Sequence, residues 1–208
     1  QLNTNVYYMR YKDQLVLSGE LHAVGAPLRY NVGDSYRLGL EIDANVRLSR
    51  TFQWRPNIAL SDNRNIDFFF ERDGVLQNLG NTRIAYSPRL IAGNILSYQP
   101  NANLQVSVLS KFVGEQYMGN IDSDNSLLDS YTQTDFNVQY TINMNSFVKS
   151  IEISGLVNNI FDADIVSNGY FFTFNDDFSN PGTVTTVEGA GYYPQAGINF
   201  LVGATINF

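Results

Sequence analysis

Hydrophobic and polar positions alternate along most of the chain, which is the pattern of β-strands with one apolar face. The clearest segment is 36–48. Its two faces are Tyr36, Leu38, Leu40, Ile42, Ala44, Val46 and Leu48 against Arg37, Gly39, Glu41, Asp43, Asn45 and Arg47. Strands of globular proteins are usually about 5–6 residues long, whereas a tilted strand needs about 9–11 to cross a bilayer. The length of this segment favours a strand that spans a membrane.

The same alternation recurs along the chain and ends at Phe208. In the last segment, one face is made by Ala196, Ile198, Phe200, Val202, Ala204, Ile206 and Phe208. Because the period is two throughout, we expect about eight antiparallel strands. They cover 2–12, 36–48, 52–60, 88–99, 103–112, 131–142, 151–158 and 196–208. Pro56 lies inside one of them and cannot donate to a ladder, so we expect a β-bulge there.

The connections between these strands alternate in length. Short turns follow Leu48, Tyr98 and Ile142. The other connections are long and rich in Asn, Asp, Gly and Ser, and cover 13–33, 62–87, 113–130 and 159–195. Short turns at one rim and long loops at the other are typical of outer-membrane barrels, and loops this long are uncommon in compact soluble domains.

Charged side chains occupy the polar face of 36–48, where Arg37 and Arg47 accompany Glu41 and Asp43. A protein core would not accept these charges without partners, whereas a wet lumen would. In hydrocarbon, strands can span only as a closed barrel with an apolar outside. We expect the four charges to pair with one another. Aromatic residues beside the short turns, Phe52, Trp54 and Tyr98, suit an interfacial girdle.

Composition narrows the function classes. The chain has 13 Lys and Arg against 20 Asp and Glu, a net charge of -7, no cysteine and one histidine. The charge balance argues against nucleic-acid binding, and the missing cysteines exclude thiol chemistry and cysteine zinc sites. No apolar run reaches the length of a transmembrane helix. His22 is the only histidine, and no G-x-S-x-G motif accompanies it, so we expect neither an enzyme nor a bound cofactor.

One loop has the alternating oxygen ligands of a calcium site, Asp122-Ser123-Asp124-Asn125-Ser126. A calcium loop of the EF-hand type also needs a glycine at its sixth position and a glutamate at its twelfth. Both are missing here, so we interpret the segment as a solvated loop without a metal.

Several segments resemble TonB-dependent outer-membrane receptors, particularly the iron-complex type found in Bacteroidota. The resemblance is carried by Tyr7-Tyr8-Met9-Arg10-Tyr11-Lys12-Asp13-Gln14, Asn31-Val32-Gly33 through Gly39-Leu40-Glu41, Val113-Gly114-Glu115-Gln116-Tyr117, Val157-Asn158-Asn159-Ile160-Phe161 and the last strand. Each motif is weak alone, but their order and spacing are specific and cover most of the chain.

The resemblance implies a particular architecture for residues 1–208. They would be the C-terminal β-barrel segment, about eight strands of the roughly 22 that surround a plug in such transporters. The long loops would be extracellular, the short turns periplasmic, and the protein would lie in the bacterial outer membrane. The plug domain and the TonB box would be absent from these residues. The parent would take up a scarce nutrient, such as a ferric siderophore or another iron complex, energised by TonB through that missing plug.

The resemblance also suggests where partners bind. Ligand contacts would come from the long loops, and the candidates there are His22, Phe69, Tyr170, Phe171 and Tyr192. Outer-membrane lipid would cover the apolar faces. The last strand resembles the signal read by the barrel-assembly machinery, with Phe200, Val202, Ile206 and Phe208 on its apolar face, and a strand edge suits capture by β-augmentation.

Two other interpretations stay open at this point. An autonomous eight-stranded outer-membrane barrel with a structural or adhesive role suits the strand number and the polar inner faces. A soluble β-rich binding module explains the alternation and the turns, but not the strand length or the charged inner faces.

Overall fold

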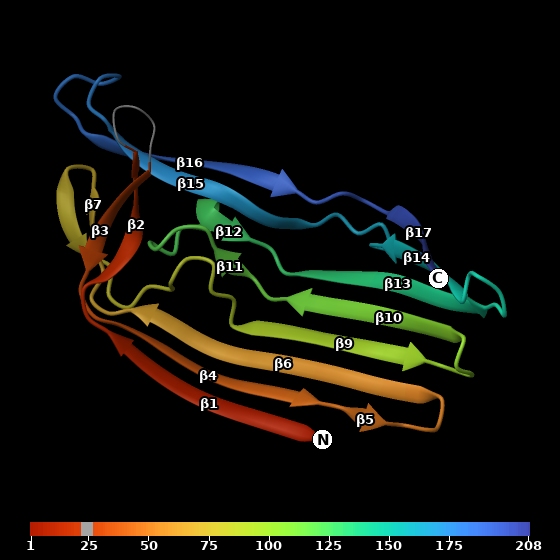
Figure 1. Cartoon of the computed structure of the whole chain (residues 1–208). Helices are drawn as coiled ribbons and strands as arrows, with labels where there is room; N and C mark the ends of the chain where they lie inside the picture. The colour runs from red at the N-terminus through yellow and green to blue at the C-terminus, as the bar shows by residue number, and fades with distance from the viewer. Residues whose placement is uncertain (22–26) are drawn as a thin grey trace.

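The computed structural model describes residues 1–21 and 27–208 and is dominated by one antiparallel sheet (Figure 1). Eight long strands follow one another across the sheet in chain order. They are β1 (Leu2–Tyr11), β4 (Ser35–Ala44), β6 (Phe52–Asn65), β9 (Leu90–Tyr98), β10 (Leu104–Val113), β13 (Tyr131–Asn143), β14 (Ser150–Asn158) and β17 (Asn199–Asn207). The short β5 (Val46–Arg47) pairs with β6. All the strands predicted from the alternation are confirmed.

The pairing register aligns the apolar positions of all these strands on one face, the apolar face. Val6 pairs with Leu40, and Leu40 with Leu60. Farther along, Val106 pairs with Val138. At the other end Gly155 pairs with Val202, which is 75% exposed. Since large apolar side chains lie open along the whole face, this surface is suited to hydrocarbon rather than water.

The opposite side, the polar face, carries amide and charged groups at matching positions. Asp43 pairs with Asn57 and Lys111 pairs with Gln133. The expected pairing among the charges of 36–48 is wrong. Asp43 instead accepts a hydrogen bond from Asn3 (2.8 Å). Neighbouring β1 therefore supplies amide partners that the spacing within one strand could not reveal.

Glu41 and Arg37 are satisfied by the same neighbouring strand. Glu41 accepts a hydrogen bond from Asn5 (3.1 Å). The Arg37 guanidinium lies 6.0 Å from the ring centroid of Tyr11, within the range of a cation–π contact. The charged side chains on the polar face of β4 thus find their partners across strands rather than along one strand.

Pro56 does not form the predicted bulge. The pairing of β6 with β9 runs through Pro56 and Asn94 without a shift. On the other side, pairing stops at Asp43–Asn57 and resumes at Val46–Trp54 in the same register. The proline is accommodated by a gap between β4 and β5, which removes the need for a ladder donor there.

Aromatic side chains gather at the rim of short turns, as predicted. Phe52 and Tyr98 are paired across β6 and β9, and their ring centroids lie 4.5 Å apart. Phe147, in the turn after β13, lies 5.3 Å from Phe208. Both contacts occur at the end of the sheet that also holds the two chain ends in Figure 1.

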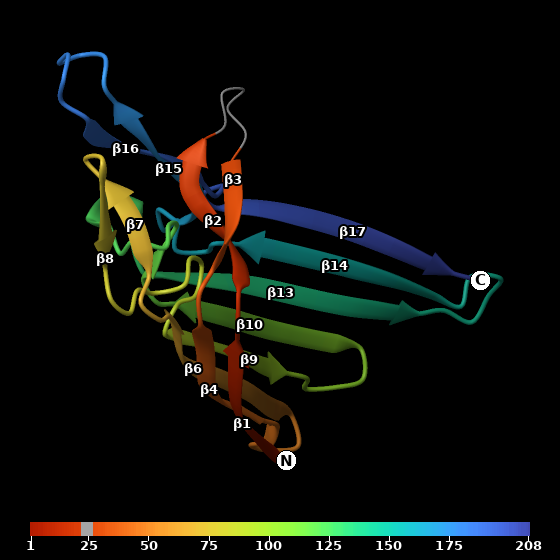
Figure 2. The same cartoon turned by 90° about the vertical axis from the view of Figure 1, so that its left-hand side faces the viewer.

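The long connections contain hairpins rather than irregular loops (Figure 2). Their elements are β2 (Gln14–Leu21), β3 (Pro27–Val32), β7 (Phe69–Arg72), β8 (Val75–Asn78), β11 (Gln116–Tyr117), η1 (Asp124–Ser126), β12 (Leu127–Leu128), β15 (Val166–Asp176) and β16 (Thr185–Pro194). β2 joins β15 through a parallel bridge, so the first and last hairpins share one four-stranded sheet. Within the described residues, no helix is long and apolar enough to cross a membrane.

The main sheet is open. β1 and β17 lie at its two edges and do not pair with each other. The structure therefore does not form the self-contained eight-stranded barrel that the strand number permitted. Edge strands of a membrane sheet need further strands to satisfy their backbone groups.

Candidate functional site

The hairpins at the long-loop end pack into one assembly, which we call the loop cap (Figures 1 and 2). Its small core consists of Val16, Val32, Phe68, Phe70 and Ile121, with Leu79 and Phe171 packed against it. These residues come from connections far apart in sequence. A shared core under long loops gives them a defined arrangement, as a binding surface requires.

A largely buried carboxylate of intermediate exposure, Glu188 on β16, links the parts of the loop cap. It accepts a hydrogen bond from Arg72 at the end of β7 (2.9 Å), and the two form an ion pair. Its other oxygen accepts hydrogen bonds from Ser123 and from Asn125 (2.9 Å), beside and within η1. The Glu188 side chain is only 11% exposed. One carboxylate thus links three connections: the one that contains β7, the one that contains η1, and its own.

Burial alone would raise the pKa of Glu188. The hydrogen bonds from Ser123 and Asn125 and the charge of Arg72 act in the opposite direction and prevail, so the pKa is lowered from its ordinary value. Since these partners favour the charged form, the carboxylate remains ionised at neutral pH and holds the network.

A second set of contacts joins the β7–β8 turn to the β15–β16 hairpin. The Asp73 backbone N–H donates to the Thr186 hydroxyl, and the Thr186 N–H donates to the Asp73 carboxylate, both at 2.7 Å. Asn175 on β15 also donates to Glu71 (3.1 Å). The two hairpins are therefore connected at a second position, where Asn175 pairs with Thr186 next to Glu188 along the ladder.

The predicted ligand contacts do not fall on one surface. Phe69 is 51% exposed, although its neighbours Phe68 and Phe70 are buried in the cap core. Phe171 is partly buried and packs against that core. Tyr170 is 49% exposed on the other side of β15. His22 lies outside the described residues.

Tyr192 is 49% exposed and lies on the side of β16 that contacts η1. Its hydroxyl donates to the Asn125 carbonyl (3.3 Å), which fixes the ring against η1. It lines a hollow of about 290 Å³ formed by Leu127, Leu128, Asp129, Ser130, Tyr131, Asp164, Val166 and Tyr192. Among the predicted contacts, Tyr192 thus lines a hollow at the surface of the cap.

The alternation of hydrophobic and polar positions did not predict a row of aromatic side chains on the outer side of β15. The rings of Tyr170, Phe172 and Phe174 are stacked along the strand, with centroids 6.2 and 6.4 Å apart. Across the ladder, Tyr170 faces Gly191 and Phe172 faces Gly189. A Cβ atom at either glycine would lie within 2.6 Å of a ring atom, so both glycines are needed for the rings to lie flat. The sequence signal was the i, i+2, i+4 aromatic spacing opposite two glycines.

Side-chain oxygen atoms of the Asp122–Ser126 loop form hydrogen bonds with other groups of the chain. The Asp122 carboxylate accepts the Arg83 backbone N–H (2.9 Å). Ser123 caps η1 by accepting the Asn125 N–H (3.2 Å) and also binds Glu188. Among the described residues, no group of three or more His, Asp or Glu side chains is arranged to hold a metal.

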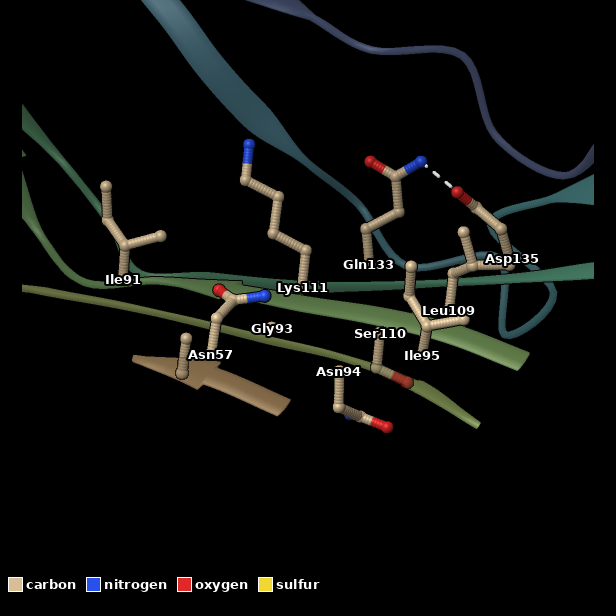
Figure 3. A pocket seen from close by; sticks show the side chains of 11 residues that line it. Asn57, Ile91, Gly93, Asn94, Ile95, Leu109, Ser110, Lys111, Gln133 and Asp135 are labelled. Carbon is tan, nitrogen blue, oxygen red and sulfur yellow. Dashed lines mark hydrogen bonds between the residues drawn. The ribbon is translucent and has the colours of Figure 1, made fainter. Parts of the chain in front are cut away.

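The polar face of the main sheet has its own hollow of about 430 Å³ over β6, β9, β10 and β13 (Figure 3). Asn57, Lys111, Gln133 and Asp135 project to the same side, while Asn94 and Ser110 project to the other. Gln133 donates to Asp135 (3.1 Å), which also accepts the Asn159 N–H (2.8 Å). Lys111 has no ion-pair partner among residues 1–21 and 27–208. Ile91, Ile95 and Leu109 project to the same side as Lys111, so the hollow combines one cation, one carboxylate and two amides with apolar side chains.

Solved structures of two import receptors and one transporter share this fold. The ferric-catecholate import receptor Fiu from E. coli K12 matches with a TM-score of 0.63 and 17% identity over 98% of this chain and 24% of that chain. The copper transporter OprC matches with a TM-score of 0.67 and 18% identity over 100% of this chain and 29% of that chain. The ferric yersiniabactin uptake receptor FyuA from Yersinia pestis matches with a TM-score of 0.61 and 17% identity over 100% of this chain and 27% of that chain.

These matches show the fold, and the chain spans about a quarter of the length of the structures that it resembles. A comparison with curated protein sequences found no match. A family model described as "TonB dependent receptor-like, beta-barrel" matches residues 1–160, well over half of the chain. The two-faced antiparallel sheet, the short-turn rim and the loop cap all agree with that match. The chain therefore belongs to the TonB-dependent receptor-like β-barrel family.

Proposed function

We propose that the chain forms part of the barrel wall of an outer-membrane receptor that takes up a scarce nutrient, a ferric siderophore or another iron complex. The observation that carries the proposal is the sheet with one apolar and one polar face, within a family of TonB-dependent receptors. Lipid would cover the apolar face, and the nutrient would pass along the polar face. TonB would act through a plug outside these residues.

The choice of an iron complex has two supports. The motif resemblance is to the iron-complex branch found in Bacteroidota. Among the matched structures, Fiu and FyuA are named as receptors for ferric complexes, whereas OprC is named as a copper transporter. We therefore favour an intact iron complex over a bare copper ion.

The loop cap supplies the proposed contacts with the ligand. Tyr192 in its hollow and the exposed rings of Phe69 and Tyr170 offer flat apolar surfaces for an aromatic iron chelator. His22 stays a predicted contact. Phe171 also stays a predicted contact, with its partly buried ring packed against the cap core. No catalytic residue is proposed.

We also propose that β17 carries the signal for the barrel-assembly machinery. Phe200, Val202 and Ile206 are exposed on its apolar face, and Phe208 follows the strand. The strand lies at the edge of the sheet, so its free backbone groups are available for capture by β-augmentation.

Deleting the gene should abolish the uptake of one iron complex. The measurement is cell-associated radioactive iron after adding a ferric catecholate, ferric yersiniabactin or ferric citrate, each in separate cultures. We expect one complex to lose its saturable uptake in the deletion strain and to regain it on complementation, and the same loss when tonB is deleted. Unchanged uptake of every iron complex, together with loss of copper uptake, would contradict the iron proposal.

A further inference from the structure

A hollow lies on the apolar face of the main sheet, toward the end that carries the long loops. Its volume is about 750 Å³, and its apolar lining consists of Val6, Leu38, Leu40, Leu60 and Leu90. Four of these residues pair in one row across β1, β4, β6 and β9, from Val6 through Leu40 and Leu60 to Leu90. None of them belongs to the polar face or to the loop cap.

The apolar face becomes polar just beyond this row, toward the long loops. Leu38 pairs with Asp62, and Tyr36 pairs with Arg64. The rings of Tyr8 and Tyr36 lie at the same level, with their centroids 6.3 Å apart. Tyrosine is enriched at the boundary between hydrocarbon and head groups, so this change places that boundary at the upper edge of the hollow.

Arg89 supplies a positive charge at this boundary. It is exposed and lines the hollow directly before Leu90, the first residue of β9. Its carbonyl accepts the Ser61 backbone N–H (2.9 Å), which fixes this residue beside β6. Within residues 1–21 and 27–208, the Arg89 side chain forms no ion pair.

The acidic residue in the lining, Asp62, already has partners for both of its oxygens. One oxygen accepts a hydrogen bond from the Tyr36 hydroxyl (2.7 Å). The other forms an ion pair with Arg64 (3.0 Å). The charge of Arg89 is therefore left in excess beside an apolar hollow, which is the arrangement that an anionic amphiphile requires.

We propose that this hollow binds a lipid with an anionic phosphate head group, from the membrane leaflet next to the long loops. The Arg89 guanidinium binds the phosphate through two parallel hydrogen bonds, and the acyl chains lie against Val6 and the four leucines. A free phosphate ion would leave this apolar lining exposed to water, whereas acyl chains cover it. The inference rests on the proposed function only in that the apolar face meets lipid.

Photo-crosslinking in nanodiscs tests the proposal with the full-length receptor. Leu38 is replaced by benzoylphenylalanine, and the bilayer contains equal amounts of phosphatidylglycerol and phosphatidylcholine with identical acyl chains. Mass spectrometry gives the ratio of the two lipids crosslinked to the folded receptor. We expect phosphatidylglycerol to be enriched about fivefold, the factor that one arginine contributes at an anionic membrane surface. In Arg89→Ala the ratio should return to that of the bilayer, whereas Arg89→Lys should keep part of the enrichment.

Arg29→Ala is the matched control, since it removes an exposed arginine of β3, outside the hollow, and should leave the enrichment unchanged. Equal crosslinking of the two lipids when Arg89 is present, or the same enrichment in R89A, would overturn the proposal. So would stabilisation by inorganic phosphate that R89A loses while the crosslinked lipids keep the bilayer ratio, because the site would then hold a free anion. Iron uptake is measured separately, so this proposal and the transport function can fail independently.

Discussion

Replacing Val202 with arginine should sharply reduce the amount of receptor assembled in the outer membrane. Val202 lies in the middle of β17 on the apolar face and is 75% exposed in the sheet. An arginine in contact with lipid near the middle of a barrel costs about 2–4 kcal/mol. It also interrupts the apolar row that we propose as the assembly signal. The measurement is the fraction of receptor in cell membranes that shows the heat-modifiable mobility of a folded barrel.

Leu201→Arg is the matched control because the adjacent residue faces the polar side and is 63% exposed. We expect this variant to assemble nearly as well as the wild type. Removal of Phe208 should act in the same direction as V202R and impair assembly more than ligand binding. If V202R and L201R assembled equally, the two faces would not differ in environment, and the assignment of the apolar face to lipid would be wrong.

Glu188→Gln should loosen the loop cap without disturbing the main sheet. The substitution keeps the shape but removes the charge that binds Arg72, Ser123 and Asn125. Leaving the partners of a buried charged group unsatisfied costs about 1–3 kcal/mol. Hydrogen exchange should therefore speed up in β7–β8 and β15–β16, while β10 and β13 keep their protection.

Glu115→Gln provides the comparison, because it breaks an ion pair with Arg83 in which the glutamate is 58% exposed. Such a surface pair contributes about 0–1 kcal/mol, so exchange in the cap should hardly change. Equal effects of E188Q and E115Q would contradict a special role for Glu188.

The same network gives the cap a pH dependence. The pKa of Glu188 is lower in the folded cap than its ordinary value of 4.5. Its contribution to stability is therefore complete above about pH 4.5 and is lost as the pH falls through the lowered pKa. Wild-type exchange in β15–β16 should accelerate over that acidic window, and E188Q should not show this component.

The alternation predicted the main sheet well because its strands obey one physical constraint, one apolar face and one polar face. The signal was clearest in the segment 36–48. Pro56 was misjudged because the gap that accommodates it is in the preceding strand, between β4 and β5. Sequence spacing within one strand has no information about its neighbour.

The loop cap was largely hidden from sequence reasoning. Arg72 and Ser123 lie 116 and 65 residues from Glu188, so no local spacing relates them. The strands β15 and β16 were hidden within a connection rich in Asn and Gly. Phe171 and Tyr170 are adjacent and chemically alike, yet one packs inside the cap and the other is exposed. The composition identified this region as long connections, but it could not show which side chains face the cap core and which are exposed.

The most direct test of the account measures the environment of successive residues along β10. Residues 1–208 contain no cysteine, so single cysteines at Gln105, Val106, Val108 and Leu109 can carry nitroxide labels in the intact, membrane-embedded receptor. We predict that labels at Val106 and Val108 collide mainly with oxygen dissolved in lipid. Labels at Gln105 and Leu109 should instead be more accessible to a water-soluble nickel complex. Four labels with the same ratio of oxygen to nickel accessibility would contradict a sheet that separates lipid from a polar lumen.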